Sequence, residues 1–185
     1  MRVEKIAKGH RRQLRDFTSG ESRVDEWLKQ RALSAQTKHG SVTRLLVEGD
    51  VVAGFHTLAH GELAVDQVPP ELFAGGQAPI RAPRTVTLAW LGVTQSCAKR
   101  GLGTALTHHA LAVCYRSYQE VPFVAVIVDA LTPQSAAFFK AKGFSVIPGT
   151  EGVLPGLAAK LYLSAASLIA AVEEPPAAEG GTPTA

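Results

Sequence analysis

The sequence lacks the features of a secreted, disulfide-bonded or membrane-spanning protein. It has 2 cysteines in 185 residues, Cys97 and Cys114, which is too few for a disulfide framework. It has no run of about 18 uncharged apolar residues, the length that a membrane-spanning helix needs. Residues 1–6 lack the apolar core of a signal peptide. We therefore expect a cytoplasmic protein without membrane association.

Acidic residues are sparse in the first part of the chain. Residues 1–44 contain 11 of the 19 Lys and Arg but 5 of the 16 Asp and Glu, so their balance is +6 whereas the remainder carries −3. An excess of positive charge at one end favours a polyanionic partner such as nucleic acid. A solvated basic face without a partner explains the same composition equally well.

Length and composition predict one globular domain followed by a tail. A content of 46% hydrophobic and 19% charged residues is typical of soluble globular proteins. We place the domain at residues 1–170, which is long enough for a sizeable core. The tail, residues 171–185, is rich in Pro, Ala, Gly and Glu, and we expect it to be disordered.

Apolar alternation and helical periodicity predict a chain that mixes strands and helices. We expect strands at residues 2–7, 41–48, 51–63, 85–94, 123–130, 144–147 and 160–163, and helices at 21–40, from 102 to beyond 113, at 133–142 and after 164. Gly49 and Asp50 form a two-residue turn, which predicts an antiparallel hairpin. The order predicts an α/β (α+β) fold with a mixed sheet and one central βαβ crossover. The Pro- and Gly-rich residues 64–83 are expected to form a loop that borders a substrate site.

Residues 84–104 combine a buried strand, a glycine-containing turn and a helix start. The first N–H groups of a helix have no internal partner, and the helix dipole adds partial positive charge there. Gly101 and Gly103 allow close approach of a ligand, and Lys99 and Arg100 add full charges. This arrangement suggests a phosphate or pyrophosphate site. A tight turn with a solvated Lys-Arg pair explains these residues alone equally well.

A second cluster of polar residues lies in the strand at 51–63. His56, Leu58, His60 and Glu62 share one face of that strand. Two histidines and a carboxylate on one face are suited to binding a metal or relaying a proton. Alternation along a strand often produces such sets by coincidence, so we expect no metal site.

The element order, together with two motifs, resembles the GNAT superfamily of acyl-CoA-dependent N-acyltransferases. The family pattern Gln/Arg-x-x-Gly-x-Gly/Ala is similar to residues 98–103, with Ala98 where Gln or Arg is usual. The family's Phe-Tyr-x-x-x-Gly-Phe helix end is similar to residues 138–144, with Phe139 in the place of Tyr. The resemblance implies a mixed, mostly antiparallel sheet flanked by helices in a single domain.

Residues 17–28, which read Phe-Thr-Ser-Gly-Glu-Ser-Arg-Val-Asp-Glu-Trp-Leu, resemble the opening of one GNAT subgroup. Its members are toxins that acetylate the amino group of aminoacyl-tRNA and are paired with ribbon-helix-helix antitoxins. The likeness extends over residues 10–165. It implies acetyl-CoA as co-substrate and an amine acceptor, with aminoacyl-tRNA as the leading candidate. A ribbon-helix-helix antitoxin and a second copy of the chain, as a homodimer, are the partners to test.

The resemblance also implies which residues form the site. The backbone of residues 91–93 would hold the pantetheine arm, and the N–H groups of residues 99–104 would hold the pyrophosphate. The cofactor residues implied in this way are Leu91, Gly92, Val93, Lys99, Arg100, Gly101, Leu102, Gly103 and Thr104. The basic residues expected to contact tRNA phosphates are Lys5, Lys8, Arg11, Arg12 and Arg15.

The catalytic acid is left open by the sequence, because Phe139 has no proton to donate. Substitutes are Tyr162, Ser135, Tyr115 or a water molecule. No carboxylate lies between Arg81 and Ala98 to act as a base. An α-amine with a pKa of about 7.7–8.0 needs a base less than a lysine amine at about 10.4. This favours an α-amine acceptor, including an aminoacyl ester. The alternative functions are acetylation of a small-molecule or peptide amine and a catalytically weak CoA-binding module.

Overall fold

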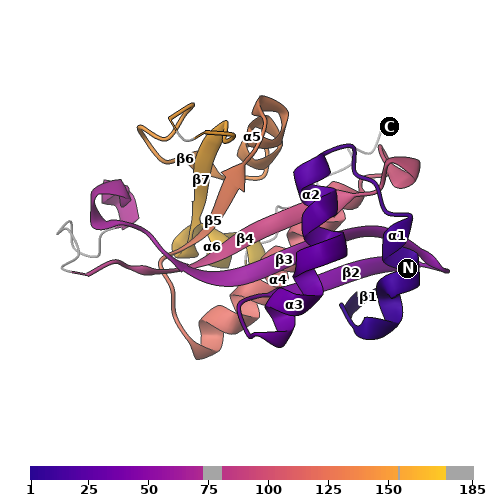
Figure 1. Ribbon diagram of the computed structural model, residues 1–185. Coiled ribbons are helices and arrows are strands. Elements are labelled where there is room, and N and C mark those ends of the chain that lie inside the picture. The colour runs from indigo at the N-terminus through magenta and orange to yellow at the C-terminus, as the bar shows by residue number, and fades with distance from the viewer. Residues whose placement is uncertain (73–80, 154, 174–185) are drawn as a thin grey trace, which may run out of the picture.

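The computed structural model describes residues 1–72, 81–153 and 155–173 (Figure 1). These residues form a seven-stranded sheet in the order β1-β2-β3-β4-β5-β7-β6. Neighbouring strands are antiparallel except for the parallel pair β4 and β5. The strands are β1 (Arg2–Lys5), β2 (Val42–Glu48), β3 (Val51–Glu62), β4 (Arg84–Val93), β5 (Ala125–Ala130), β6 (Ser145–Val146) and β7 (Ala159–Ser164). The predicted mixed, mostly antiparallel sheet is confirmed.

Helices alternate with these strands in the predicted order. They are α1 (Arg11–Arg15), α2 (Ser22–Glu26), α3 (Ala32–Thr37), α4 (Leu102–Glu120), α5 (Pro133–Lys140) and α6 (Ala165–Glu173). A π turn, η2 (Trp27–Arg31), joins α2 to α3, so the single helix expected at 21–40 contains a local insertion. The short helix α1 was not predicted. Among the described residues, no helix has the length and apolarity needed to cross a bilayer.

Two local predictions depend on turn and cap chemistry, and both are confirmed. The β2–β3 hairpin closes with Glu48 opposite Val51, around the two-residue turn. Helix α5 begins with Thr132 as N-cap, whose hydroxyl accepts a hydrogen bond from the Ser135 N–H at 3.1 Å. Pro133 takes the first helical position, where its missing N–H costs nothing.

The helices divide between the two faces of the sheet. Helices α1, α2 and α3 lie on one face, where α1 contacts β3, α2 contacts β4 and α3 contacts β2, and α4 lies on the other face (Figure 1). On the first face, Leu14, Val24, Leu28 and Ala32 pack against strand residues such as Phe55. Val24, Leu28 and Ala32 follow one another at four-residue spacing, which keeps their side chains on one side of the helical segment.

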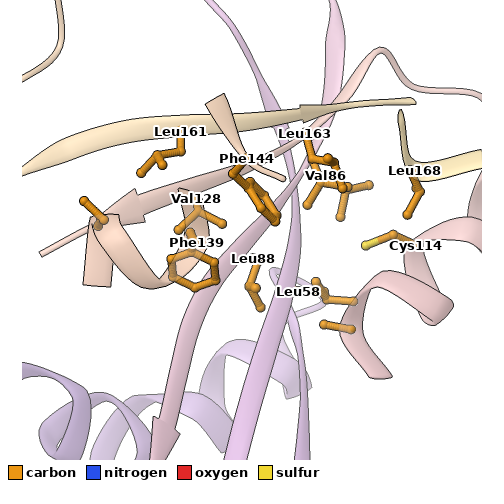
Figure 2. Close-up of a cluster of buried hydrophobic side chains, with 14 of the residues drawn as sticks. Leu58, Val86, Leu88, Cys114, Val128, Phe139, Phe144, Leu161, Leu163 and Leu168 are labelled. Carbon is orange, nitrogen blue, oxygen red and sulfur yellow. The ribbon is translucent and has the colours of Figure 1, made fainter. Parts of the chain in front are cut away.

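The largest buried cluster lies under α4, α5 and α6 (Figure 2). Leu88 of β4 and Val128 of β5 meet Phe139 of α5 there. Phe139 packs edge-on against Phe144, with ring centroids 5.5 Å apart. Cys114 of α4 is buried in the same cluster, as expected for a small apolar side chain. This cluster fixes α4 and α5 relative to the strands that carry the site.

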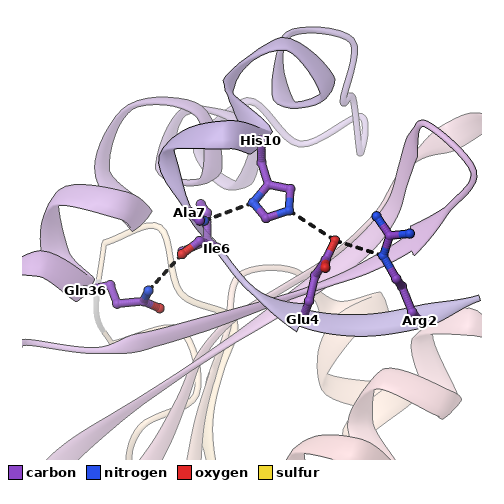
Figure 3. A network of polar contacts seen from close by, with 6 residues as sticks. All are labelled: Arg2, Glu4, Ile6, Ala7, His10 and Gln36. Atoms are coloured by element: carbon purple, nitrogen blue, oxygen red, sulfur yellow. Dashed lines mark hydrogen bonds and ion pairs between the residues drawn. The ribbon is translucent and has the colours of Figure 1, made fainter.

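A polar network connects the N-terminal strand to its neighbours (Figure 3). His10 Nδ1 accepts a hydrogen bond from the Ala7 N–H at 3.0 Å, so its Nε2 carries the proton and donates to Glu4 at 3.1 Å. Glu4 also accepts a hydrogen bond from the Arg2 Nε–H at 3.2 Å. Gln36 of α3 donates to the Ile6 carbonyl at 2.9 Å. These bonds hold the basic N-terminal segment against the sheet.

The described parts of the loop expected at residues 64–83, which are residues 64–72 and 81–83, do not line the site described below, so the expectation that they border a substrate site is not met there. It contains two short 3₁₀ turns, η3 (Val65–Gln67) and η4 (Pro70–Leu72), and residues 73–80 lie outside the described part. Leu63 and Val68 pack over β5 and β7, and Glu71 accepts the hydroxyl hydrogen of Tyr162. The loop therefore covers the sheet there. The tail from residue 174 onward is also outside the described residues, so its disorder stays a prediction.

Candidate functional site

The site is built where the two parallel strands separate. Residues 85–87 of β4 pair with residues 125–127 of β5, and no pairing continues beyond them in the described structure. Figure 1 shows the two strands diverging from that point. Thr57 lies opposite Trp90 and Leu58 opposite Leu88, so Ala89 is an extra residue in β4. Such a bulge bends its strand, which helps to open a gap between β4 and β5.

The separation leaves one edge of β4 unpaired. Residues 91–93 bond to β3 on one side, and their other edge faces the gap. A free strand edge offers N–H and C=O groups that can bind an extended ligand as if it were another strand. Gly92 fits only as glycine, since an added Cβ would lie 2.8 Å from Val24 and 2.9 Å from Phe55.

The turn after β4 ends in an uncapped helix start. Lys99 and Gly101 have φ values of 61° and 74°, the left-handed region that reverses the chain tightly. Gly101 is the N-cap of α4, and no side chain caps it. The N–H groups of residues 102–104 therefore have no partner within the helix. They and the dipole of this 19-residue helix make the turn suitable for an anion.

A cleft of about 550 Å³ joins the free edge to this helix start. Its walls come from both faces of the sheet, because Glu21 and Arg23 of the α2 region and Phe138 and Phe139 of α5 all line it. Two ligands can therefore meet in the gap, one from each face. The cleft walls include the expected Leu91, Gly92, Val93 and Gly103. They do not include Lys99, Arg100, Gly101, Leu102 or Thr104, which lie in the adjoining turn and helix start.

Comparison with known proteins finds relatives of this fold. No family model matches the chain. A tRNA-acetylating toxin of Mycobacterium tuberculosis is 29% identical over 132 residues, 71% of this chain and 78% of that protein. AtaT complexed with acetyl-methionyl-tRNAfMet superimposes with a TM-score of 0.77 at 20% identity, over 90% of this chain and 96% of that one. A Tyr-to-Phe variant of AtaT, bound to the C-terminus of the antitoxin AtaR and acetyl-CoA, gives 0.70 at 20%, over 91% and 95%. The chain is a GNAT-fold relative of a tRNA-acetylating toxin.

The residues at 17–28, which carried the subgroup resemblance, have a structural role in the GNAT fold of this chain. Asp25 accepts hydrogen bonds from the Ser19 N–H at 2.8 Å and the Ser19 hydroxyl at 2.6 Å. The Gln95 N–H donates to the Thr18 carbonyl at 2.7 Å. The segment before α2 is thereby fixed beside the segment that leads into the turn at residues 99–101. Ser19 itself lines the cleft.

Two tryptophans lie on the α2 side of the cleft. Trp27 and Trp90 stack with ring centroids 5.2 Å apart and planes 11° apart. The Trp27 Nε1–H donates to the Thr57 hydroxyl at 3.2 Å, which fixes the ring. Trp90 lines the cleft, so the stacked pair forms a rigid aromatic wall on the side of the cleft next to α2. We did not predict a role for Trp90, although its place on the central strand pointed to it.

Two of the proton donors proposed from the sequence lie away from the cleft. Tyr162 is 6% exposed on the face of β7 that the loop after β3 covers, where it packs with Ile127 and donates to Glu71. Burial and this hydrogen bond raise the pKa of Tyr162 to about 12. Tyr115 points toward the end of α6 and donates to Glu173 at 2.7 Å. Neither lines the cleft, so the expectation that they could replace the usual tyrosine is wrong for this conformation.

Ser135 does line the cleft, but its hydroxyl is engaged. It donates to the Thr132 carbonyl at 2.8 Å and accepts the Thr132 N–H at 3.0 Å, completing the cap of α5. Phe139, 6% exposed, also lines the cleft and presents an apolar ring. The start of α5 therefore brings two hydroxyl residues to the cleft, Thr132 and Ser135, and both hydroxyls are engaged in the helix cap.

Sequence reasoning missed two carboxylates that border the cleft, Glu21 and Asp129. Asp129 lies near the end of β5 and pairs with Lys160 Nζ at 2.6 Å. Glu21 caps α2 by accepting from the Arg23 N–H at 3.4 Å. A polar residue near the end of an apolar strand next to a strand separation was the signal for Asp129.

The histidine set of β3 is divided by the structure. His56 is fully buried and shares a 2.9 Å hydrogen bond with His109 of α4, whereas His60 and Glu62 are exposed. No group of three metal-binding side chains occurs in the described parts of the chain. Burial, with His109 and Arg44 nearby, lowers the pKa of His56 to about 3. The pair therefore joins α4 to the sheet in its neutral form.

This buried histidine predicts acid sensitivity of the fold. The unfolded chain binds a proton at His56 near pH 6.5, and the folded chain does so only near pH 3, so lowering the pH favours unfolding. Between pH 6.5 and 4 we expect His56 to remove about 1 kcal/mol of unfolding free energy per pH unit. Urea unfolding at several pH values gives the free energy of unfolding as a function of pH. Its slope should be steeper for the wild type than for His56→Gln. His108→Gln, at an exposed position of α4, is the control. Equal slopes for wild type and His56→Gln would refute the assignment.

Proposed function

We propose that this protein transfers the acetyl group of acetyl-CoA to the α-amino group of aminoacyl-tRNA. The observation that carries the proposal is the continuity of the free β4 edge with the uncapped start of α4, inside a cleft open to both faces of the sheet. An extended arm that ends in a pyrophosphate matches both features. The Mycobacterium tuberculosis relative acts on tRNA, and AtaT has been solved with acetyl-CoA and with an acetylated aminoacyl-tRNA.

The residues of the chain divide the binding of acetyl-CoA between them. The backbone of residues 91–93 pairs with the amides of the pantetheine arm, and the N–H groups of residues 102–104 bind the pyrophosphate. Gly103 leaves room there, since even an added Cβ would lie 3.6 Å from the nearest atom, on Phe138. The bound thioester supplies an electrophilic carbonyl carbon. Its position in the gap exposes that carbon to a group entering from the Trp90 side.

The chemistry then depends on positioning more than on an enzyme base. The α-amino group of an aminoacyl ester is partly neutral at pH 7, so it can attack the carbonyl directly. Holding amine and thioester together contributes much of the rate. The thiolate leaves without an assisting tyrosine more readily than an alkoxide does. Glu21 and Asp129 lie at the cleft to accept the proton that the amine loses.

The surface supports an RNA acceptor. The five basic residues named from the sequence, Lys5, Lys8, Arg11, Arg12 and Arg15, are all exposed. None of them forms an ion pair within the part of the chain that the structure describes. Free cations on one segment fit a phosphate backbone. We also propose an antitoxin partner, as in the AtaT–AtaR structure, and action in the cytoplasm. A homodimer stays a prediction from the sequence.

The direct test is acetylation of charged tRNA by the purified protein with labelled acetyl-CoA. We expect label in the RNA fraction and its release together with the amino acid when the ester bond is cleaved by mild base. Uncharged tRNA is the matched control and should stay unlabelled. Label on small amines or peptides, with none on charged tRNA, would overturn the choice of acceptor.

The two basic residues of the turn should differ in importance. Arg100 is bound by Glu48 through two hydrogen bonds of 2.8 and 3.0 Å, whereas Lys99 has no ion-pair partner among the described residues. We expect Lys99→Gln to raise the KM for acetyl-CoA about three- to tenfold, as the loss of a charge-assisted phosphate contact does. Arg100→Gln, an equal loss of charge, should change it less than about twofold. A larger effect at Arg100 would contradict this division.

A catalytically weak CoA-binding module is the second candidate, and Phe139 favours it. The distinguishing result is stabilisation by CoA, seen as a rise in melting temperature, without release of free CoA from acetyl-CoA in the presence of any amine or charged tRNA. Turnover with charged tRNA excludes it.

A further inference from the structure

A second pocket of about 460 Å³ lies away from the cleft. It is formed by β1, β2 and β3 on one side and the C-terminal half of α4 on the other, and it shares no lining residue with the cleft. Val113 of α4, which lines it, is ten residues beyond Gly103 of the cleft, or about 15 Å along the helix. A ligand in this pocket would therefore not touch the acetyl-CoA site.

The register of the sheet concentrates positive charge in this pocket. Lys5 of β1 lies directly opposite Arg44 of β2, so both side chains are on the face that α4 covers. His39 and His60 line the same pocket. No Asp or Glu is among its described lining residues. Arg116 of α4 is near enough to add to the positive potential at Arg44.

Arg44 is partly buried and has no carboxylate at ion-pair distance within the described residues. Cys114 does not compensate, because burial raises the pKa of its thiol to about 12 and keeps it neutral. Burial and the nearby Arg116 also lower the pKa of Arg44. A partly buried guanidinium without an acceptor is unfavourable, so an anion at this position would relieve it.

A second observation concerns the wall of the same pocket. Ser41 is one of its lining residues, and the buried hydroxyl of Ser41 has no hydrogen-bond partner in the described structure. Buried hydroxyl groups are almost always bonded, so an unbonded hydroxyl in the wall of a pocket that also holds an unpaired arginine indicates an acceptor that the protein itself does not supply. A phosphate oxygen would accept from both groups.

We propose that this pocket is a phosphate-binding site, formed by Arg44, Ser41 and Lys5 and separate from the turn at the start of α4. The group it takes is a phosphate, either free or at the end of an RNA strand. The volume admits a phosphate together with the sugar attached to it. Lys5 belongs also to the exposed basic segment, so an RNA strand held by that segment can place its terminal phosphate here.

Titration calorimetry tests the site with two probes, inorganic phosphate and a 5′-phosphorylated RNA trinucleotide. The same trinucleotide without its phosphate is the chemical control. We expect Arg44→Gln to weaken binding about 10- to 100-fold, as loss of a charge-assisted hydrogen bond does, and Ser41→Ala to weaken it several-fold. Arg31→Gln, an equal loss of charge on an exposed residue outside both sites, should leave binding unchanged. Because Arg44 has no partner, its replacement should not lower the melting temperature.

A further variant, Gly103→Asp, distinguishes phosphate binding in this pocket from phosphate binding at the start of α4. Its carboxylate repels phosphate from that helix start. Binding that survives in Gly103→Asp and is lost in Arg44→Gln supports the proposal. Binding lost in Gly103→Asp and kept in Arg44→Gln places the phosphate in the cleft and overturns it, while leaving the proposed transferase intact. Absence of binding to the wild type overturns it as well. Equal affinity for both probes assigns the site to free phosphate, and tighter binding of the trinucleotide assigns it to RNA.

Discussion

Gly103→Asp is expected to abolish use of acetyl-CoA without weakening the fold. An Asp at the second position of α4 places a carboxylate where the pyrophosphate would bind. Two negative charges about 4–5 Å apart repel by about 3–4 kcal/mol at an effective dielectric constant of 20, so the KM should rise about 100-fold or more. The fold should hold, because the added Cβ has room and a negative charge favours a helix N-terminus.

A neutral variant of the same shape separates charge from bulk. Gly103→Asn should raise the KM for acetyl-CoA about tenfold, between the wild type and the Asp variant, because it adds volume without repulsion. Initial rates against acetyl-CoA concentration give the three KM values, and thermal melting gives the stabilities. An Asp variant with a wild-type KM and an unchanged melting temperature would show that the pyrophosphate does not bind at this helix start.

Phe139→Tyr is expected to accelerate the reaction. The ring lines the cleft on the wall formed by α5, and a hydroxyl added to it supplies a proton donor that is not engaged in the helix cap, unlike that of Ser135. General acid catalysis contributes about 10²–10⁴-fold where geometry is optimal. In a site that did not evolve around the hydroxyl, we expect a gain in kcat of about 10- to 100-fold. Single-turnover rates at saturating acetyl-CoA and charged tRNA measure it.

The neighbouring phenylalanine provides the control. Phe144 packs against Phe139 but does not line the cleft, so Phe144→Tyr should leave kcat unchanged. It should instead lower stability by about 1–3 kcal/mol, since its hydroxyl is buried without a partner. If Phe139→Tyr leaves kcat at the wild-type value while the KM is retained, the proton reaches the thiolate from Ser135 or from water. Ser135→Ala then distinguishes these two sources.

The segment from β4 to α4 illustrates how much of the structure local sequence can predict. The strand, the turn and the helix of residues 84–120 were predictable because their apolar periodicity, two glycines and a following helical run act over a few residues. The cap of α5 and the β2–β3 turn were predictable for the same reason. The π turn at residues 27–31 and the short helix α1 were not, because their sequences carry no strong local signal and tertiary packing decides them.

The sequence by itself determined the order of elements, the central crossover and the glycine-containing turn before α4, because each follows from contacts between residues close in the chain. Only the tertiary structure decided which side chains reach the cleft. It placed Tyr162 under the loop after β3, away from the cleft. It brought Glu21 and Asp129 to the cleft and paired Arg100 with Glu48. It also gathered Lys5, Ser41 and Arg44 around a second pocket. These placements depend on strand register and on the separation of β4 from β5, which are set by packing across the whole sheet.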